Sequence, residues 1–293
     1  MPSGILLLDK PHGLSSNAAL QRVRALYARE KAGHVGSLDP LATGMLPICL
    51  GEATKVAGDL LEGRKRYRFR IALGAATATG DTEGEVTASA PIPPLTTAAV
   101  EAALAQWRGV QQQVPPMYSA IKRAGQPLYR LARQGVSVPR AARTIEINEL
   151  TLLDFDAAAL ELETLCSKGT YVRVLAEDIA RALGTCGHVA ALRRLWVEPF
   201  AAEPMHTLEE LAAALTRGEA PPLLAIDWAL QHLPRVDLDA ETARHLMQGR
   251  KVAAVGAPVA RRVRVYDGNG RLVALGEVDA AGMVQPRRLI HTE

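Results

Sequence analysis

One acidic residue, Asp39, lies in a segment whose residue types could do chemistry, GHVGSLDPLATGMLP at residues 33–47. Because proline disfavours the helical conformation in the residue before it, Pro40 predicts an extended backbone at Asp39. The three glycines of the segment permit tight turns and a close approach of the backbone to a ligand. A carboxylate held in this way can act as a nucleophile or as a base. Asp39 can equally be a helix N-cap, with Pro40 as the first helical residue and the helix dipole favouring the ionised acid.

A tyrosine and several arginines share an alternating segment at residues 64–73, which predicts a β-strand. Tyr67 falls on the apolar face of this strand, where its hydroxyl needs a polar partner. It is therefore either a core residue or part of a site. Arginines occupy the other face, and they either bind phosphate or form a solvated edge: Arg64, Arg66, Arg68 and Arg70.

Further candidate residues lie near the predicted ends of other elements. Tyr171 and Arg173 stand between a strand predicted at residues 160–166 and a helix predicted at 174–183. Core packing and surface charge would explain these two residues without any site. A second group lies in GHVAALRRLW, residues 187–196: Leu192, Arg193 and Arg194.

The composition fits a globular chain with room for one large domain and a small one: 293 residues, 48% hydrophobic and 22% charged. A net charge of +3 permits an anionic partner but does not require one. The three cysteines, without metal-type spacing, predict reduced thiols in a cytoplasmic protein. No apolar run approaches the roughly 20 residues of a membrane span, and residues 5–8 are too short for a signal peptide.

The pattern of helices and strands predicts two domains, at residues 1–230 and 235–293. In the first, a strand is expected at residues 4–8, and helices are expected to begin near Ser15 or Ser16, at Thr97 and after the capping box of Thr207 and Glu210. In the second, a helix is expected at residues 239–249. Strands at 259–266 and 271–278 follow, joined by an Asp-Gly-Asn-Gly hairpin turn, which together predict a small β-barrel-like module.

Five segments occur in an order that resembles the TruB family of pseudouridine synthases: KPHGLSS, GHVGSLDPLATGMLP, QVPPMYSAIK, SKGTYVRVLAEDIARALG and GHVAALRRLW. The resemblance covers residues 4 to about 200. Small departures are Ser15, Ser16 and Ser37, where many relatives carry threonine. The resemblance implies an α+β fold, with a mixed, largely antiparallel sheet flanked by helices. It also implies a C-terminal RNA-binding domain of the PUA type and a mobile lid at residues 122–145.

The resemblance also assigns roles to residues. Asp39 matches the catalytic nucleophile, and Arg173 matches the arginine that pairs with it and would hold the carboxylate ionised. The residues matching those around the target base are Tyr67, Tyr171 and Leu192, and His34 matches the residue that contacts displaced RNA. The candidates for RNA contact are Lys10, Arg64, Arg66, Arg68, Arg193 and Arg194.

The implied activity is isomerisation of uridine 55 in the TΨC loop of tRNA, which involves no redox change or hydrolysis. We therefore expect no metal and no cofactor, and the sequence carries no Gly-Lys-Ser/Thr phosphate loop. The expected partner is tRNA alone, with the protein a cytoplasmic monomer that needs no protein partner or membrane. Two alternatives remain from the sequence: an RNA-guided relative of this enzyme, and a non-catalytic RNA-binding or RNA-folding protein. A hydrolase using Asp39 and His34 is a weaker reading, because no nucleophile–base–orienter set is visible.

Overall fold

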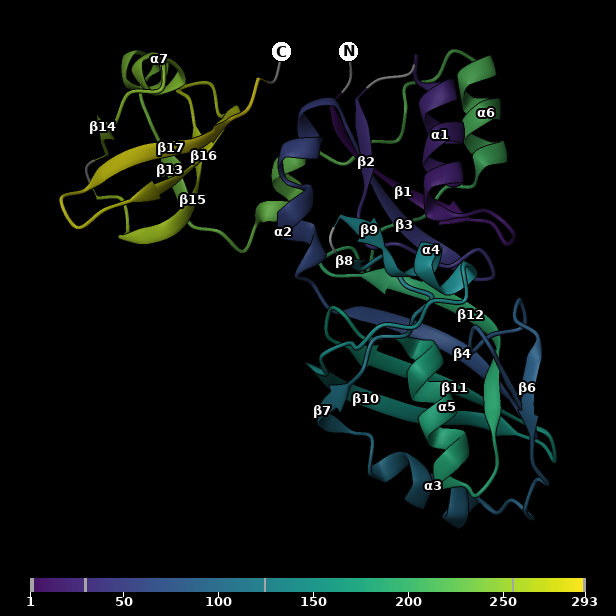
Figure 1. The fold of residues 1–293 in the computed structure, drawn as a ribbon. Helices are drawn as coiled ribbons and strands as arrows, with labels where there is room; N and C mark the ends of the chain where they lie inside the picture. Colours follow the sequence, from purple (N-terminus) through teal and green to yellow (C-terminus); the bar gives the residue numbers. More distant parts are fainter. Residues whose placement is uncertain (1–2, 29–30, 124, 255, 292–293) are drawn as a thin grey trace.

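The computed structural model describes residues 3–28, 31–123, 125–254 and 256–291. Its main feature is an eight-stranded sheet, to one side of which lies a smaller five-stranded sheet at the C-terminal end of the chain (Figure 1). Both chain ends lie on the same side of the molecule in this view. Within the described ranges, no helix has the length and apolar character needed to cross a membrane.

The large sheet has the strand order β1-β3-β12-β4-β11-β10-β7, with β2 paired to β3. Its strands are β1 (Gly4–Lys10), β2 (Ala32–His34), β3 (Thr43–Leu50), β4 (Lys65–Leu73), β7 (Gly109–Gln113), β10 (Arg143–Phe155), β11 (Ala159–Cys166) and β12 (Gly187–Val197). β3 and β12 pair in parallel, and the other pairs are antiparallel. The predicted fold class, a mixed and largely antiparallel sheet with flanking helices, is confirmed.

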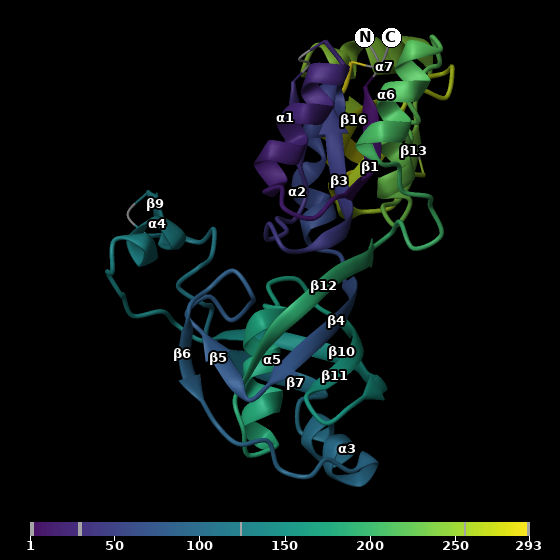
Figure 2. The same cartoon turned by 90° about the vertical axis from the view of Figure 1, so that its right-hand side faces the viewer.

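β12 joins two halves of this sheet (Figure 2). It lies beside β4 along its whole length but meets β3 only at Arg193 and Arg194. One half carries α1 (Ser16–Leu26), capped by Ser15, and α6 (Leu208–Thr216), whose capping box is Thr207 and Glu210 as predicted. The other half carries α3 (Thr97–Ala105) and α5 (Val172–Ala182). A continuous apolar core fills the space between the helices and the sheet.

The short elements outside this core are β5 (Ala75–Thr77), β6 (Val86–Ser89), η1 (Gly51–Lys55), α2 (Ala57–Leu61) and η2 (Ile226–Leu230). The segment predicted as a lid forms β8 (Lys122–Arg123), β9 (Gln126–Pro127) and α4 (Leu128–Arg133). β9 and α4 stand out from the body of the molecule (Figure 2).

The alternative reading of the sequence, in which Pro40 opens a helix with Asp39 as its N-cap, is wrong. The Ala42 amide donates to the Asp39 carbonyl at 3.0 Å, which closes a turn, and β3 begins directly afterwards at Thr43. β3 must start there to pair with β1, where Gly44 lies opposite Lys10. No residues remain for a helix, so Asp39 is not an N-cap.

The C-terminal part forms a curled half-barrel of five strands, in the order β13-β15-β16-β17-β14, with one helix. Its elements are β13 (Arg235–Asp237), α7 (Ala240–Met247), β14 (Val252–Ala253), β15 (Ala260–Tyr266), β16 (Leu272–Val278) and β17 (Met283–Leu289). The predicted helix and hairpin are present, and the Asp267 carboxylate accepts the amides of Asn269 and Arg271 within the turn. This half-barrel packs on the large sheet through an apolar cluster that includes Tyr266 and Ile290.

Candidate active site

A cavity of 740 Å³ lies where β12 passes from β3 to β4. Its walls come from the loop before β3, from β4 and β12, from residues 119–121 and from the chain that leads into α5. Five residues expected at the site line it together: Asp39, Tyr67, Tyr171, Arg173 and Leu192. The fold thus assembles residues up to 153 positions apart in the sequence around one hollow.

Hydrogen bonds from two buried side chains, Ser16 and Lys10, hold the backbone of the loop that carries Asp39. The Ser16 hydroxyl accepts the Leu38 amide at 2.7 Å and donates to the Leu38 carbonyl at 2.9 Å. The Lys10 ammonium donates to the carbonyls of Pro40 at 3.3 Å and Leu14 at 2.6 Å. These bonds fix the backbone on both sides of Asp39.

Lys10 is therefore not the RNA contact that the sequence suggested. It is fully buried, and burial lowers its pKa to about 8. Within β1 the Lys10 side chain is turned inward. Its ammonium also donates to the Pro11 carbonyl, so its partners are carbonyl groups and not the RNA phosphate suggested by the sequence.

The predicted ion pair between Asp39 and Arg173 is present. Arg173 Nε lies 2.9 Å from Asp39 Oδ2, and one guanidinium nitrogen lies 3.3 Å from Oδ1. The arginine is 4% exposed and also donates to the carbonyls of Thr79 at 2.5 Å and Tyr118 at 2.7 Å. The Asp39 carboxylate, by contrast, is 40% exposed and faces the open pocket.

A third charge completes this group, because buried Asp81 lies 3.7 Å from Arg173 Nε. Arg173 stands in the first turn of α5, where the helix dipole disfavours a cation. The two carboxylates offset that cost. Sequence reasoning missed Asp81, although its position between two glycines in a predicted loop was a signal for a fixed side chain.

Arg173 favours the ionised form of Asp39, as expected, but it does not have the largest effect on the pKa of this acid. Desolvation raises the pKa of Asp39 above its ordinary value of 3.8, and the Arg173 guanidinium opposes the rise. The nearby Asp81 carboxylate adds to it. The sequence argument considered the cation alone, whereas desolvation by the surrounding protein has the larger effect on this pKa.

Tyr67 and Leu192 form the apolar wall of the pocket. They lie on neighbouring strands, β4 and β12, and each is 8% exposed. Burial raises the pKa of the Tyr67 hydroxyl, and the Arg194 guanidinium opposes that rise. Tyr67 lies directly opposite Arg194 in the strand pairing, so both side chains belong to the same face of the sheet.

Tyr171 closes another side of the pocket and is held through its backbone. Its amide donates to the Gln113 side chain at 2.8 Å, and the Gln113 amide donates back to the Tyr171 carbonyl at 3.1 Å. Gln113 is buried, and it begins the QVPPMYSAIK segment. No local signal in the sequence indicated this clamp, because Gln113 and Tyr171 are 58 residues apart.

The arginines of β4 lie on the face of the sheet opposite to Tyr67. They pair with acidic residues instead of standing free, as does Arg64 directly before the strand: Arg64 with Glu198, Arg66 with Glu149 and Glu163, Arg68 with Glu161. Arg193 forms a two-pronged pair with Asp9, at 2.7 and 3.0 Å. Arg194 is 1% exposed, so it is too deeply buried to meet an RNA phosphate on the surface.

His34 lies in β2, outside the pocket lining. Its Nδ1 atom is buried and has no hydrogen-bond partner among the described residues. Burial lowers the pKa of His34, and Arg194 adds to that effect. Within the described ranges, no group of three or more His, Cys, Asp or Glu side chains is arranged to hold a metal ion.

Three family models match consecutive parts of the chain. Residues 24–172 match the N-terminal domain of TruB family pseudouridylate synthase, and residues 173–231 match the C-terminal domain of tRNA pseudouridylate synthase B. Residues 234–290 match the C-terminal model of pseudouridine synthase II TruB.

Individual relatives agree with these models over nearly the whole length. The chain is 48% identical to the tRNA pseudouridine synthase B of Coxiella burnetii (strain RSA 331) over 291 residues, which are 98% of this chain and 94% of that protein. It is 49% identical to the tRNA pseudouridine synthase B of Stutzerimonas stutzeri over 295 residues, with coverage of 99% and 96%. Among solved structures, a chain in the crystal structure of a Cbf5-Nop10-Gar1 complex matches with a TM-score of 0.74, covering 99% of this chain and 84% of that one. At 24% identity this last similarity concerns the fold alone.

Proposed function

This chain belongs to the TruB family of pseudouridylate synthases, and we propose that it converts uridine 55 in the TΨC loop of tRNA into pseudouridine. The observation that carries the proposal is the Asp39–Arg173 pair, which sits beside Tyr67 and Leu192 in a pocket open to solvent. The chain is 48% identical to a tRNA pseudouridine synthase B, so the substrate class follows from that relative.

The pocket suits a base that has been extruded from its stack. Enzymes that act on a base in folded nucleic acid flip it out and hold it against aromatic or apolar groups. Tyr67 and Leu192 provide such groups on adjacent strands, and Tyr171 lies across the same cavity. A uracil ring between Tyr67 and Leu192 would be brought to the carboxylate of Asp39.

Asp39 supplies the reactive group. During the isomerisation the bond between N1 of the base and C1′ of the ribose breaks and a new bond joins C5 to C1′. The C5 hydrogen leaves to solvent as a proton, and N1 takes up a proton from solvent. A carboxylate can act in such a sequence as covalent nucleophile. Arg173 fixes its orientation through Nε and a guanidinium nitrogen, while its other bonds hold the arginine itself in place.

Segment 122–145 is proposed as a lid over the bound RNA. Ile121, directly before the segment, and Ile145, its last residue, line the pocket, and α4 between them stands away from the body of the molecule (Figure 2). The base of the segment is anchored by two backbone bonds, from Leu128 to Ile121 at 2.8 Å and from Tyr129 to Ser119 at 3.1 Å. Closure of this segment would cover the base and exclude water from the reaction.

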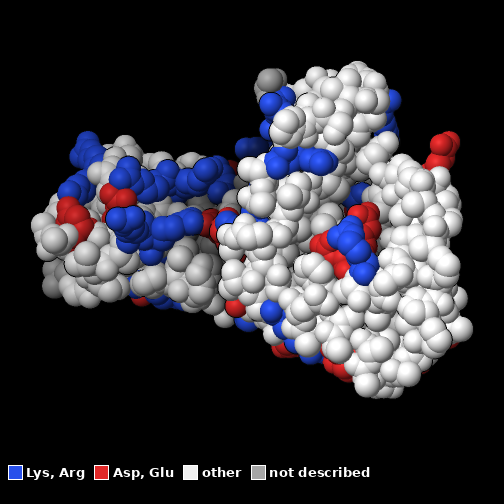
Figure 3. Space-filling view, turned by 60° about the horizontal axis from the view of Figure 1, so that its bottom comes forward, with Lys and Arg blue, Asp and Glu red and all other residues white. Residues whose placement is uncertain are grey.

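Residues 1–230 are proposed as the catalytic domain and residues 235–293 as an RNA-binding domain. The second part holds ten Lys and Arg against seven Asp and Glu, so it carries the whole net charge of +3. Basic side chains gather over it in the space-filling view (Figure 3). Basic residues outnumber acidic ones in the lining of a cleft between α2 and this domain: Lys55, Arg261, Arg262, Arg287 and Arg288 against Asp59 and Glu62.

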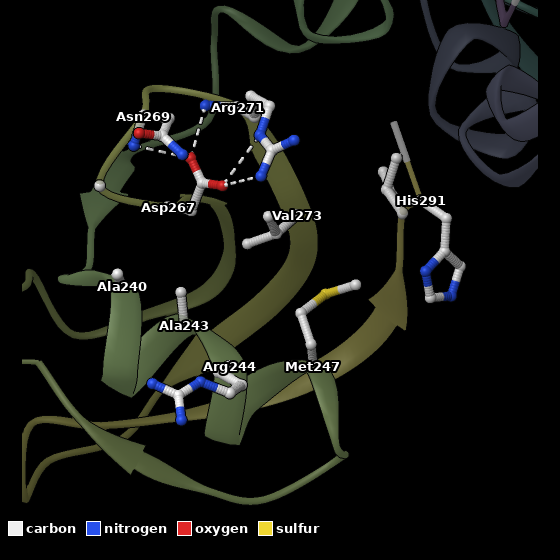
Figure 4. A pocket seen from close by; sticks show the side chains of 11 residues that line it. Ala240, Ala243, Arg244, Met247, Asp267, Asn269, Arg271, Val273 and His291 are labelled. Carbon is white, nitrogen blue, oxygen red and sulfur yellow. Dashed lines mark hydrogen bonds and ion pairs between the residues drawn. The ribbon is translucent and has the colours of Figure 1, made fainter. Parts of the chain in front are cut away.

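Within the described residues, Arg261 and Arg288 have no acidic partner, which leaves them available for RNA phosphates. A second hollow lies between α7 and the hairpin, where Arg244 and His291 face it and Arg271 is paired with Asp267 (Figure 4). Because phosphate contacts position a nucleic acid without reading its sequence, we assign this domain to binding and not to chemistry.

The protein is proposed to act alone, as a cytoplasmic monomer without guide RNA, protein partner, metal or cofactor. The test is incubation of the purified protein with a tRNA transcript tritiated at C5 of its uridines. Release of one tritium per tRNA is expected from the protein alone. Release that required a guide RNA or a partner protein would favour the RNA-guided alternative, and binding without any release would favour the non-catalytic one.

A further inference from the structure

Arg194 occupies the point where the two halves of the large sheet meet. It lies on β12, beside Gly44 of β3 on one side and beside Tyr67 of β4 on the other. Its side chain is 1% exposed and lines the pocket. It is thus in contact with both strands that flank the site, and unlike its neighbour Arg193, which is 39% exposed, it is buried there.

The guanidinium of Arg194 is satisfied by backbone carbonyls. Nε donates to the Met45 carbonyl at 2.7 Å and a terminal nitrogen donates to the Gly36 carbonyl at 2.8 Å. Among the described residues, Arg194 forms no ion pair with a carboxylate. Burying a charge without an opposite charge is costly, so a chain keeps such a group where it serves a further purpose.

The two positive-φ glycines that bracket Asp39 are both explained by Arg194. At Gly44, with a φ of +98°, a Cβ atom would lie 2.1 Å from the Arg194 carbonyl oxygen. At Gly36, with a φ of +69°, it would lie 3.2 Å from a guanidinium nitrogen of Arg194. The segment that carries Asp39 therefore rests at both ends on this one residue.

We infer that Arg194 is a positioning residue for the reaction, which fixes the Asp39 segment relative to Tyr67 and keeps a positive charge beside the Tyr67 hydroxyl. This role replaces the RNA contact expected from the sequence, and it rests on the proposed function. The positive charge of Arg194 also opposes the rise that burial causes in the pKa of Tyr67.

The test compares Arg194→Lys and Arg194→Met with the wild-type protein, in single-turnover rate at saturating enzyme and in Kd for tRNA. A displaced catalytic segment can cost on the order of 100-fold in rate, and we expect about that loss for Arg194→Met. Arg194→Lys should retain more of the rate because it keeps the charge. We expect Kd to stay within about threefold, since phosphate and shape contacts elsewhere set the affinity. Arg181→Met is the matched control, because Arg181 is an exposed arginine of α5 that pairs with Asp178.

Gly36→Ala gives a second route if Arg194→Met fails to fold. It leaves the charge of Arg194 in place but pushes a methyl group against the guanidinium, so the rate should fall with Kd unchanged. A wild-type rate in Arg194→Met, or in Gly36→Ala where Arg194→Met does not fold, would overturn the inference. Weaker tRNA binding by Arg194→Met at an unchanged rate would also overturn it. If the log–log salt slope of Kd fell by about 0.7 as well, Arg194 would be a phosphate contact. The proposed function fails separately, if the wild-type protein itself forms no pseudouridine.

Discussion

The Asp39→Asn substitution removes the charge of the pocket carboxylate while it keeps the size of the side chain. Because Asp39 does not cap a helix, the substitution changes no secondary structure. An amide cannot act as the nucleophile, and loss of such a group typically costs on the order of 10⁴-fold in kcat. That loss corresponds to about 5.4 kcal/mol in the activation free energy.

The same substitution should leave folding nearly intact. Arg173 keeps its bonds to the Thr79 and Tyr118 carbonyls and stays 3.7 Å from Asp81, so it is not left without a partner. Asp39 is 40% exposed, which limits the pair's contribution to the free energy of unfolding. We expect a loss of about 1 kcal/mol or less, or a Tm lowered by no more than about 4 °C.

The assay is single-turnover pseudouridine formation, measured together with a binding titration and a melting curve. Asp178→Asn is the matched control, because Asp178 also pairs with an arginine of α5 but lies outside the pocket lining. It should keep the wild-type rate. The Asp39→Asn protein should be folded and should bind tRNA within about tenfold of wild type, because phosphate contacts set the affinity. If such a protein retained more than about a tenth of the wild-type rate, the loss would be far smaller than that expected for a catalytic group. Asp39 would then not be the catalytic residue.

Three further predictions address the charges of the protein. Desolvation raises the pKa of Asp39 above 3.8 and Arg173 opposes that rise, so activity should fall as the pH drops toward this pKa. Arg173→Met removes the opposing charge, so the fall in activity at low pH should begin at a higher pH. A pH–rate profile that did not move would contradict this. The double variant Arg261→Gln/Arg288→Gln should raise KM with little change in kcat, which is the pattern of lost uniform binding. It should also make Kd depend less steeply on salt. A lower kcat at unchanged KM would assign these arginines to the chemistry. EDTA should not change the rate on tRNA kept folded by monovalent salt, and a loss of activity that added Mg²⁺ restored at constant tRNA structure would show that a metal takes part.

The structure also guides how the C-terminal domain should be probed. Removing it would uncover apolar residues of the large domain, because Tyr266, Leu272 and Ile290 pack into a shared cluster with them. Point substitutions of exposed arginines avoid that effect, so they test binding more cleanly than a truncation from residue 235 onward.

Local patterns predicted much of this fold. The alternation of residues 64–73 correctly separated Tyr67 from the arginines, since a strand sends successive side chains to opposite faces. The caps of α1, α6 and α7 were readable from Ser15, Thr207 and Asp239. The meeting of Asp39 with Arg173, 134 residues away, came from the resemblance to a family and not from any local pattern.

The errors concern burial and charge partners, which depend on neighbours far away in the sequence. Lys10 and Arg194 were read as RNA contacts, but carbonyls from other segments surround them. Arg66 was read as a candidate for RNA contact, but it pairs with Glu163 of the adjacent strand β11 and with Glu149 of β10, the strand beyond it. The alternative of a helix at Pro40 followed from local propensity, which the pairing of β1 with β3 overrides.

The most direct test of the central claim is the position at which pseudouridine forms. An unmodified tRNA transcript is incubated with the purified protein alone, and pseudouridine is mapped at single-nucleotide resolution, with Asp39→Asn protein in parallel. The account predicts one new pseudouridine, at position 55, and none with the variant. A wild-type protein that left uridine 55 unchanged, or an Asp39→Asn protein that modified it equally well, would contradict the account.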